Sequence, residues 1–308
     1  MKVACVIHSL SGGGAERVLA GLVSRLAQRN HQLTLITLDD GRQEGYQIDP
    51  AVERCCLDVI SEGGYVFTRI RNTINRIDAL ARAIAQTAPE VILSFCDRTN
   101  ILTLLAARNQ SVPVVVSERS EPSQQNLGRF WEWMRNRQYP RAATIIALTD
   151  HSARYLRRRL GDNVVVIPSA VESPPVMSDR SIAQANQRIV GIGRLETEKG
   201  FDRLLEAFSD LIVRAPADYQ AWNLRIIGEG SMRSKLEQRI GQLGLEQQVA
   251  LPGWIQPAWE ELAQATLFAL PSRYEGFPST LMEAIAAGVP SIAVDCPSGP
   301  GAVIENGD

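Results

Sequence analysis

The chain has 308 residues, 45% of them hydrophobic and 21% charged, which suits a globular protein of about two domains with separate cores. No stretch approaches about eighteen consecutive apolar residues, so the sequence excludes a membrane-spanning helix and allows only peripheral contact with a membrane. Its five cysteines include no C-x-x-C pair, which argues against a zinc site or a disulfide framework and favours a reducing cytoplasm.

Charge is distributed unevenly along the chain, although the formal net charge is only −2. Residues 1–180 carry 22 basic and 18 acidic side chains, whereas residues 181–308 carry 10 and 16. Within residues 66–160 the counts are 15 and 7, and the basic side chains are arginines. A basic surface of this kind suits anionic lipids or pyrophosphate groups. Because no nucleic-acid-reading motif accompanies the charge, we expect no nucleic-acid partner.

Short β-branched runs alternate with longer helical patterns in the first half of the chain. This alternation predicts a parallel sheet covered by helices on both faces. Ligands of such sheets bind beyond the carboxyl ends of the strands, so the loops that follow the strands are the first candidates for a site. The predicted strands are Lys2–His8, Gln32–Leu38, Val91–Phe95, Val112–Ser117, Thr144–Leu148 and Val164–Ile167.

A polar, proline-containing stretch from Pro168 to Gln187 interrupts the pattern, and a second cycle of strands and helices follows it. We therefore predict a first domain over residues 1–170, a linker over 171–187 and a second domain over 188–308. The sequence predicts two doubly wound α/β domains that offer their loops to a shared cleft. The predicted strands of the second domain are Arg188–Gly193, Trp222–Ile227, Val249–Leu251, Leu267–Leu270 and Ser291–Val294.

A glycine loop follows the first predicted strand. Its three glycines, Gly12–Gly14, permit the backbone to approach a phosphate or a sugar closely before a helix begins. The dinucleotide fingerprint G-x-G-x-x-G is absent, and neither Asp39 nor Asp40 marks a clear ribose site, which argues against a nicotinamide cofactor. His8, at the end of the strand, either contacts a ligand or is satisfied by its neighbours.

The second domain opens with a strand, a glycine and two cations five positions apart. Arg194 can donate two parallel hydrogen bonds to phosphate oxygens, and Lys199 adds a point charge. Both cations suit a position where negative charge accumulates as a glycosidic bond to phosphate breaks. The alternative is a pair of solvated surface charges.

Two carboxylates lie eight positions apart in the run Glu275-Gly276-Phe277-Pro278-Ser279-Thr280-Leu281-Met282-Glu283. We expect Glu275 in a loop and Glu283 in the first turn of the helix that this loop opens. The amino end of a helix attracts anions, so it could hold a diphosphate between a sugar and a ribose bound by the two carboxylates. An ordinary capping box from Thr280 to Glu283 is the alternative.

Taken together, the segments Gly13–Arg17, Gly193–Gly200 and Glu275–Glu283 resemble the successive signatures of family 4 retaining glycosyltransferases, which have the GT-B fold. The resemblance implies that Arg194 and Lys199 bind the donor diphosphate and that Glu283 binds the ribose. It makes Glu275 a ligand of the donor sugar and places Gly13 and Gly14 over the diphosphate. With Arg194, Lys199 and Glu275 as the catalytic candidates, it assigns the rest of the donor site to Gly276, Phe277, Pro278, Ser279, Thr280 and Leu281.

Two further segments refine the resemblance. Trp254 follows a strand where such enzymes often hold the base, although a core tryptophan is equally compatible with its position. The segment Asp295–Gly301 is similar to bacterial members that extend lipid-linked oligosaccharides or lipopolysaccharide and usually use UDP-sugars. We therefore expect a nucleotide-sugar donor and no metal or other cofactor.

The chain departs from the family where many relatives carry a histidine after the strand that here ends at Ser117. It reads Glu118-Arg119 instead, so no general base can be carried over. Asp97, Glu118 and Arg119 are our candidates for contact with the acceptor on the first domain. Each could equally form a surface ion pair.

The end of the chain is a second departure, because relatives continue past the Glu305-Asn306-Gly307 turn with another strand and helices. We expect that the second domain is truncated at Asp308, as a fragment, or that its sheet is completed differently.

Two basic stretches of the first domain, residues 66–82 and 126–141, mix arginines with apolar side chains. In the second, Phe130, Trp131, Trp133 and Met134 alternate with four arginines, and Arg157–Arg159 could join the same face. Basic amphipathic helices with aromatic residues can lie on anionic bilayers. The alternative is a core helix with a solvated basic face.

From these observations we predict a retaining glycosyltransferase that moves a hexose or N-acetylhexosamine from a UDP-sugar to a lipid-linked glycan. A nucleotide-sugar epimerase of the same fold would need the same diphosphate site without a glycan acceptor. A truncated, non-catalytic nucleotide-sugar-binding protein is the third alternative.

Overall fold

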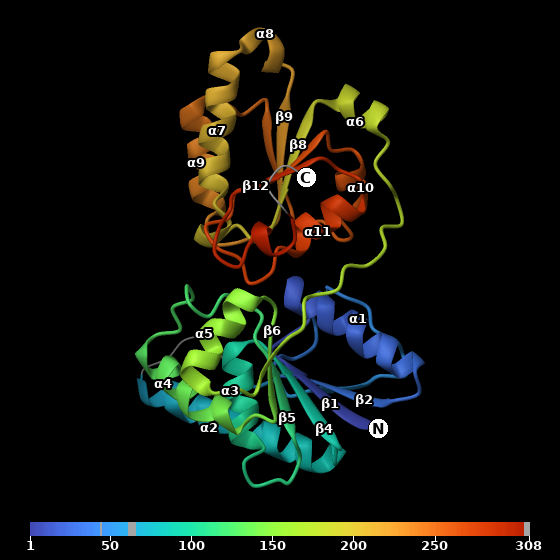
Figure 1. Ribbon diagram of the computed structural model, residues 1–308, viewed down its shortest axis with the longest axis vertical. Helices are drawn as coiled ribbons and strands as arrows, with labels where there is room; N and C mark the ends of the chain where they lie inside the picture. The colour runs from blue at the N-terminus through green and yellow to red at the C-terminus, as the bar shows by residue number, and fades with distance from the viewer. Residues whose placement is uncertain (44, 61–65, 305–308) are drawn as a thin grey trace. The chain divides into compact units, whose positions relative to one another are not determined.

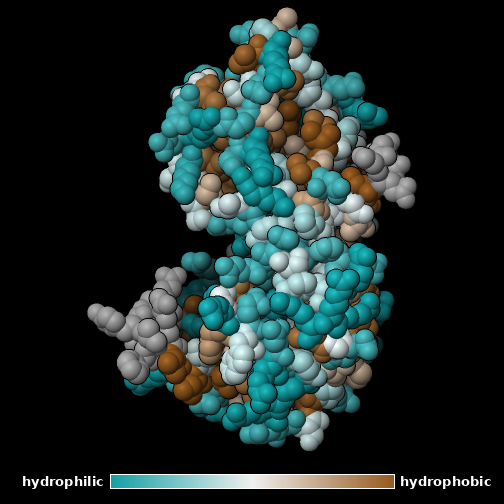
Figure 2. Space-filling model, turned by 60° about the vertical axis from the view of Figure 1, so that its left-hand side comes forward, coloured by the Kyte–Doolittle hydropathy of each residue, from teal (hydrophilic) through white to brown (hydrophobic). Residues whose placement is uncertain are grey.

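The computed structural model describes residues 1–43, 45–60 and 66–304, with the backbone alone for residues 66–69. It consists of two compact units, Met1–Ser169 and Ala170–Asp308 (Figure 1). The predicted turn at Glu305–Gly307 lies outside the described residues. Figure 2 shows that hydrophilic residues cover most of one face of the molecule, while hydrophobic residues form separate patches.

The first unit contains a parallel sheet in the order β3-β2-β1-β4-β5-β6-β7. Six of these strands occur where the sequence predicts them, each ending within one residue of the predicted end. The short edge strand β3 was not predicted, because its charged and cysteine residues carry no β-branched run. The strands are β1 Lys2–Ile7, β2 Gln32–Thr37, β3 Glu53–Cys56, β4 Val91–Phe95, β5 Val114–Ser117, β6 Thr144–Ala147 and β7 Val164–Val166.

Helices cover both faces of this sheet, because successive side chains of each strand point to opposite faces. Val3 and Cys5 of β1 pack with Leu19 of α1, whereas Ala4 and Val6 pack with residues of α2, α3 and α5. The helices are α1 Gly14–Gln28, α2 Val66–Thr87, α3 Asp97–Ala106, α4 Arg129–Gln138, the 3-10 turn η1 Tyr139–Arg141 and α5 Asp150–Leu160.

The second unit repeats the arrangement with a five-stranded parallel sheet in the order β10-β9-β8-β11-β12. All five strands occur at the predicted places, and β10 is longer than predicted. The strands are β8 Arg188–Ile192, β9 Asn223–Ile227, β10 Val249–Gly253, β11 Leu267–Leu270 and β12 Ser291–Ala293. The prediction of two doubly wound α/β domains is therefore confirmed.

Two helical layers enclose the second sheet. Ile189 and Leu224 pack with α7 and α9, and Val190 and Phe268 pack with α10 and α11 (Figure 1). The helix α6, Arg180–Asn186, lies within the segment that we predicted as a linker. The other helical segments are η2 Thr197–Lys199, α7 Phe201–Arg214, α8 Pro216–Tyr219, α9 Arg233–Leu243, α10 Trp259–Ala263, α11 Ser279–Ala286 and η3 Pro300–Ala302.

Each sheet reverses its strand order at one place, between β1 and β4 in the first and between β8 and β11 in the second. Loops at the carboxyl ends of such neighbouring strands diverge toward opposite faces, which leaves a crevice for ligands. The loops after β1 and β4 carry the glycine run and Asp97. The loops after β8 and β11 carry Lys199 and Glu275.

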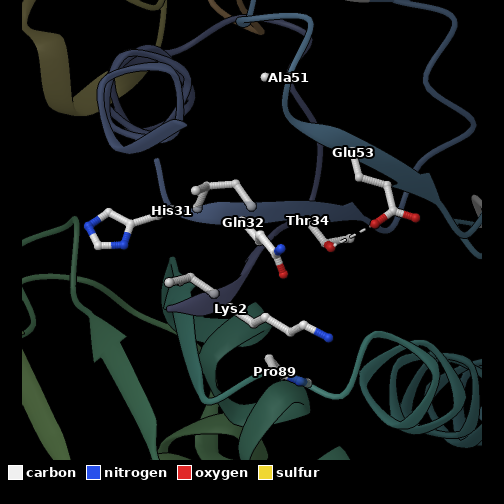
Figure 3. Close-up of a pocket in the computed structure, with 9 residues that line it drawn as sticks. Lys2, His31, Gln32, Thr34, Ala51, Glu53 and Pro89 are labelled. Atoms are coloured by element: carbon white, nitrogen blue, oxygen red, sulfur yellow. Dashed lines mark hydrogen bonds between the residues drawn. The ribbon is translucent and has the colours of Figure 1, made fainter. Parts of the chain in front are cut away.

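A pocket also lies at the opposite edge of the first sheet, where β1, β2 and β3 begin. Lys2, Gln32 and Glu53 line it together with Pro89, and Glu53 accepts a hydrogen bond from Thr34 there (Figure 3). This is the amino-terminal edge of the strands, away from the loops that the sequence singles out. Among the described residues, no helix is both long and apolar enough to cross a membrane.

Candidate functional site

Lys199 and Glu275 meet at the point where the second sheet reverses. Lys199 ends the turn η2 after β8, and Glu275 lies in the loop between β11 and α11. The Lys199 ammonium donates to both carboxylate oxygens of Glu275, at 2.7 and 2.9 Å. Ser272 donates its hydroxyl to the same carboxylate at 2.6 Å. These two groups lie 76 positions apart in the sequence, and the fold brings them into an ion pair in which Glu275 is buried and the Lys199 side chain is 17% exposed.

Glycines allow the loops of this site to touch along their backbones. A Cβ on Gly228, after β9, would lie 1.9 Å from the carbonyl oxygen of Gly193, and one on Gly230 would lie 2.5 Å from that of Leu195. The amide of Leu195 donates to the Glu229 carbonyl at 2.8 Å. The loops after β8 and β9 are therefore fixed against each other by contacts that no larger residue permits.

Arg194 lies in the same loop but points toward solvent, with 66% of its side chain exposed. Its guanidinium donates to Glu198 at 2.9 Å. Both Arg194 and Glu275 act electrostatically on Tyr274, whose pKa is raised by burial and by the neighbouring Glu198. The charged groups of the two loops thus gather around one tyrosine, and the exposed guanidinium can exchange its carboxylate partner for a ligand.

Helix α11 begins at Ser279, and its N-cap residue is Pro278. No side chain caps the helix, so the alternative of a capping box from Thr280 to Glu283 is wrong. The prediction that Glu283 lies in the first turn is also wrong, because α11 starts one residue before Thr280 and Glu283 falls in the second turn. Glu283 is buried, with 4% of its surface exposed.

The first turn of α11 nevertheless presents backbone N–H groups beside the Glu275 loop. The amide of Ser279 donates to the Phe277 carbonyl. The amide of Met282 donates to the Pro278 carbonyl, four positions earlier, which is the first bond of the helical pattern. Thr280 and Leu281 have no residue four positions earlier within the helix to accept their amides. These two N–H groups, next in the chain to Gly276 and Phe277, suit an anion.

Trp254 directly follows β10 and is 46% exposed, so the alternative of a core tryptophan is wrong. The preceding Gly253 accepts a hydrogen bond from the amide of Gly228 at 2.8 Å. This bond places the start of the Trp254 loop next to the glycine-rich loop after β9. An indole can stack on a planar base through its ring face.

In the first domain, Tyr46 holds the glycine loop. Its hydroxyl donates to the Gly13 carbonyl at 2.9 Å and accepts the Gly13 amide at 3.1 Å. Gly13 is extended, so both its polar groups face the same side and one hydroxyl satisfies them. His8 lies 3.1 Å from the carboxylate of Glu16 at the start of α1, which agrees with the alternative in which neighbours satisfy His8.

The three acceptor candidates follow neighbouring strands, but they differ in exposure. Glu118 is 1% exposed and accepts the Tyr139 hydroxyl at 2.9 Å, so its reading as a surface ion pair is wrong and burial leaves it poorly placed to contact an acceptor. Asp97 begins α3 and accepts the Gln125 amide at 2.5 Å. Arg119 stacks on the Phe95 ring at 5.2 Å and donates to Ser169 at 2.6 Å.

Burial perturbs the ionisation of two of these groups. It raises the pKa of Glu118 to about 7, with the nearby Asp97 charge acting in the same direction. Burial also lowers the pKa of Arg119 to about 10, although the carboxylates around it oppose that shift. Asp97 and Arg119 keep partly exposed side chains at the carboxyl end of the first sheet.

Sequence reasoning missed the residues that hold the site in place. Ser272 anchors Glu275, Tyr46 anchors Gly13, and Arg273 forms an ion pair with Asp202 at 2.6 Å. Arg273 and Ser272 stand next to the Glu275 motif, so their position was a usable signal. The pattern around Tyr46 carries no such signal, because its contact spans 33 positions.

The comparisons with known proteins agree with this geometry. Residues 12–173 match the family Glycosyltransferase Family 4, and residues 177–308 match the family Glycosyl transferases group 1. In structure, the chain is similar to HepE of Anabaena in complex with UDP and glucose, with a TM-score of 0.79 and 17% identity. That likeness covers 97% of this chain and 82% of the other. It shows the fold, GT-B with two Rossmann-like domains.

Two relatives are similar over almost all of the chain. One is the GalNAc-alpha-(1->4)-GalNAc-alpha-(1->3)-diNAcBac-PP-undecaprenol alpha-1,4-N-acetyl-D-galactosaminyltransferase of Campylobacter jejuni, 25% identical over 92% of this chain and 77% of the relative. The other is the lipopolysaccharide 1,6-galactosyltransferase of Escherichia coli, 23% identical over 99% of this chain and 82% of the relative. Because the first family match alone covers more than half of its residues, the chain belongs to glycosyltransferase family 4.

Proposed function

We propose that this chain is a retaining hexosyltransferase that moves a hexose or N-acetylhexosamine from a UDP-sugar to a lipid-linked glycan. The observation that carries the proposal is the meeting of Lys199 and Glu275 where the second sheet reverses, beside the exposed Arg194. The Lys199 cation suits the diphosphate of a nucleotide-sugar, and the Glu275 carboxylate beside it suits the hydroxyl groups of the sugar. The names of the Campylobacter and Escherichia relatives support a glycan acceptor on a lipid.

Donor binding replaces the ion pairs of the free protein. Lys199 leaves Glu275 for the diphosphate, and Arg194 leaves Glu198 for the same group, joined by the N–H groups of Thr280 and Leu281. Glu275 then accepts hydrogen bonds from the hydroxyl groups of the sugar, Glu283 binds the ribose, and Trp254 stacks on the base. Gly13 and Gly14 are the donor contacts that we assign to the first domain.

The chemical step uses charge on the leaving group. Breaking the glycosidic bond places negative charge on the diphosphate, which Lys199 and Arg194 stabilise more in the transition state than in the bound donor. The two cations make a metal ion unnecessary in this proposal. The leaving phosphate oxygen takes the acceptor proton, so the step needs no histidine base. Bond formation on the same face of the sugar gives retention.

The acceptor side is assigned to the first domain, with Asp97 and Arg119 as the contacts. Asp97 is held by Gln125 and can accept a sugar hydroxyl. Arg119 can donate to a sugar oxygen or to a phosphate of the lipid carrier. Glu118 enters the proposal as a buried group that positions this loop.

We also propose peripheral contact with an anionic membrane through α4. Phe130 and Trp133 on this helix are 60% and 58% exposed, whereas Trp131 and Met134 pack against the core. Arg129 and Arg137 are exposed on the same helix. The side chains of residues 66–69, in the other basic stretch, lie outside the described residues.

The function is tested by measuring nucleotide release from UDP-, GDP- and ADP-sugars, with and without a lipid-linked oligosaccharide. We expect acceptor-dependent release from a UDP-sugar, and a product whose anomeric configuration matches the donor. Lys199→Ala and Arg194→Ala should each lower kcat by about 10²- to 10³-fold, the usual loss on removing one charge-stabilising donor.

Two matched variants control for the loss of surface charge in the same domain. Arg214 forms an exposed i,i+4 pair with Asp210, as Arg194 does with Glu198, so Arg214→Ala is the control for Arg194→Ala. The exposed Lys235 on α9 serves in the same way for Lys199. Both control variants should retain full activity.

Each alternative function predicts a different result. Conversion of a UDP-sugar without a glycan would identify an epimerase, and tight UDP binding without turnover would identify a binding protein. An inverted product would reject the retaining mechanism. Near-normal transfer by both Lys199→Ala and Arg194→Ala would reject the site.

A further inference from the structure

A second charged contact joins the two loops that carry Lys199 and Glu275. Arg273 donates two parallel hydrogen bonds to Asp202, at 2.8 and 2.6 Å, and a third to the Thr197 carbonyl at 2.8 Å. The backbone amide of Arg273 donates to the Glu198 carbonyl at 2.7 Å. Asp202 follows Lys199 by three positions, and Arg273 precedes Glu275 by two.

The packing around this contact leaves little room for movement. Gly200, between Lys199 and Asp202, has a φ of +68°, and a Cβ there would lie 2.1 Å from the Pro271 carbonyl oxygen. Arg273 and Asp202 are partly exposed, at 27% and 41% of their side chains. Bidentate geometry and the added backbone bonds distinguish this pair from an ordinary surface ion pair.

The Lys199–Glu275 bond and the Arg273–Asp202 bond differ in what donor binding does to them. In the proposed function, on which this inference rests, Lys199 and Glu275 must separate to hold the diphosphate and the sugar. Once they separate, their bond no longer holds the η2 turn against the β11–α11 loop. The Arg273–Asp202 contact involves neither group and can remain intact.

We propose that Asp202 and Arg273 are positioning residues that keep Lys199 and Glu275 in register while the donor is bound. The pair touches no substrate. It acts by fixing the distance between the two loops when their direct ion pair opens. Displacements of about 1 Å at a catalytic group can lower a rate by about 10²-fold, so loosening this contact should be visible in turnover.

The test compares Asp202→Asn, Arg273→Gln and the double variant with a control pair whose carboxylate lies on the same helix as Asp202. Glu206, one turn after Asp202 on α7, forms an equally bidentate pair with Arg239 of α9, at 2.5 and 2.8 Å. Glu206→Gln and Arg239→Gln remove the same kind of bond elsewhere in the domain. They should leave donor turnover unchanged.

We expect each single variant at Asp202 or Arg273 to lower kcat by about tenfold to 10²-fold, with a smaller change in the KM for the donor. The double variant should lose no more than the worse single variant, because both remove one contact. Additive losses, equal losses in the control pair, or a fall in kcat that follows the thermal unfolding temperature would overturn the proposal.

Hydrogen exchange with and without UDP separates this inference from the proposed function. In the variants, amides of residues 197–200 and 272–276 should exchange faster than in the unaltered protein, most clearly with UDP bound. If the unaltered protein binds UDP but transfers no sugar, the proposed function fails while exchange still tests the contact. Unchanged exchange in these segments would reject the contact even in an active enzyme.

Discussion

Glu118 is a carboxyl group that the fold buries, with 1% of its surface exposed. Its Oε2 accepts the Tyr139 hydroxyl, and its Oε1 lies 3.1 Å from the Ser120 hydroxyl oxygen. Ser120 also lies 2.7 Å from the amide oxygen of Gln125, whose nitrogen is committed to Asp97. A serine hydroxyl has one hydrogen, so Ser120 shares its donor between the Glu118 carboxylate and the Gln125 amide oxygen. Burial outweighs the hydrogen bonds from Tyr139 and Ser120, which favour the charged form, and raises the pKa of Glu118 to about 7.

The raised pKa of Glu118 makes stability depend on pH. Between 4.5 and about 7, the folded protein holds a proton on Glu118 that the unfolded chain releases. Stability therefore falls as the pH rises through this window, and above it the full cost of the buried charge, about 3 kcal/mol, is present. Glu118→Gln keeps an acceptor for Tyr139 and offers Ser120 an amide donor, without the charge.

We expect Glu118→Gln to be more stable than the unaltered protein at pH 8.5 by up to about 3 kcal/mol, and nearly equal to it below pH 5. Unfolding in urea, monitored through the hydrogen exchange of amides in β5 and β6, reports on the stability of the first domain alone. Glu90→Gln, an exposed carboxylate at the other end of the sheet, should show no such pH dependence. A pH-independent difference for Glu118→Gln would mean that Glu118 stays charged.

At the scale of single residues, the sequence predicts which charged residues lie at the site, but it does not predict which of them are buried. Glu118 and Asp97 look alike as acidic residues after strands, yet the fold buries the first and leaves the second partly exposed. Tyr139, which decides the environment of Glu118, lies 21 positions away in an unrelated pattern. Local periodicity contains no information about such contacts.

The loops between elements show the same limit in a different form. The glycine after β8 was recognisable as part of a motif of strand, glycine and two cations, but the partner that it contacts was not. Gly228 adopts a φ of +146° and faces the Gly193 carbonyl, a contact between loops 35 positions apart. The strands themselves were predictable because β-branched runs bounded by turn residues are a local property.

A substitution at Gly228 therefore tests whether the contact between the loops after β8 and β9 shapes the proposed donor site of the second domain. Gly228→Ala would place its Cβ 1.9 Å from the Gly193 oxygen and force the two loops apart. We expect a loss of more than about 2 kcal/mol in the stability of the second domain, together with weaker UDP binding. Thermal unfolding and calorimetric titration with UDP measure the two effects.

Gly244→Ala is the matched control for this substitution. Gly244 also has a left-handed φ, +66°, but no atom lies within 4 Å of where its Cβ would stand. It should cost only about 1 kcal/mol for the backbone strain and leave UDP binding unchanged. If both variants behave alike, backbone strain alone explains the effect, and the loop contact has no special role.

On the scale of the whole molecule, two parallel sheets that each reverse their strand order at one place hold different chemistry at that place. The reversal lies between the first and fourth strands of each domain, and the carboxyl ends there carry Gly13 and Asp97 in one domain and Lys199 and Glu275 in the other. Alternating strands and helices predict this architecture, because each element is specified locally and parallel crossovers are right-handed. The sequence alone does not reveal the ion pairs that occupy the loops.

The uneven distribution of charge between the two domains can be interpreted only when the whole molecule is considered. The basic excess of the first domain includes Arg129 and Arg137, which are exposed beside Phe130 and Trp133 on α4. Positions 130, 133 and 137 recur at helical spacing, so aromatic and basic side chains share one face. An anionic bilayer offers partners to both, whereas a neutral bilayer offers them only to the rings.

We therefore expect the protein to sediment with vesicles that contain phosphatidylglycerol and to remain in solution with pure phosphatidylcholine vesicles. The double substitution of Phe130→Ala and Trp133→Ala should lower the partition coefficient for vesicles by at least about tenfold, because each ring buries apolar surface worth about 1.5 kcal/mol or more. Arg129→Glu should weaken binding in a salt-dependent manner, at about 1 kcal/mol for each arginine removed. Arg214→Glu, in the acidic second domain and 80% exposed, should leave binding unchanged. Equal binding to both lipids, or equal effects of the two arginine substitutions, would mean that α4 is an ordinary solvent-facing helix and that the acceptor reaches the enzyme without it.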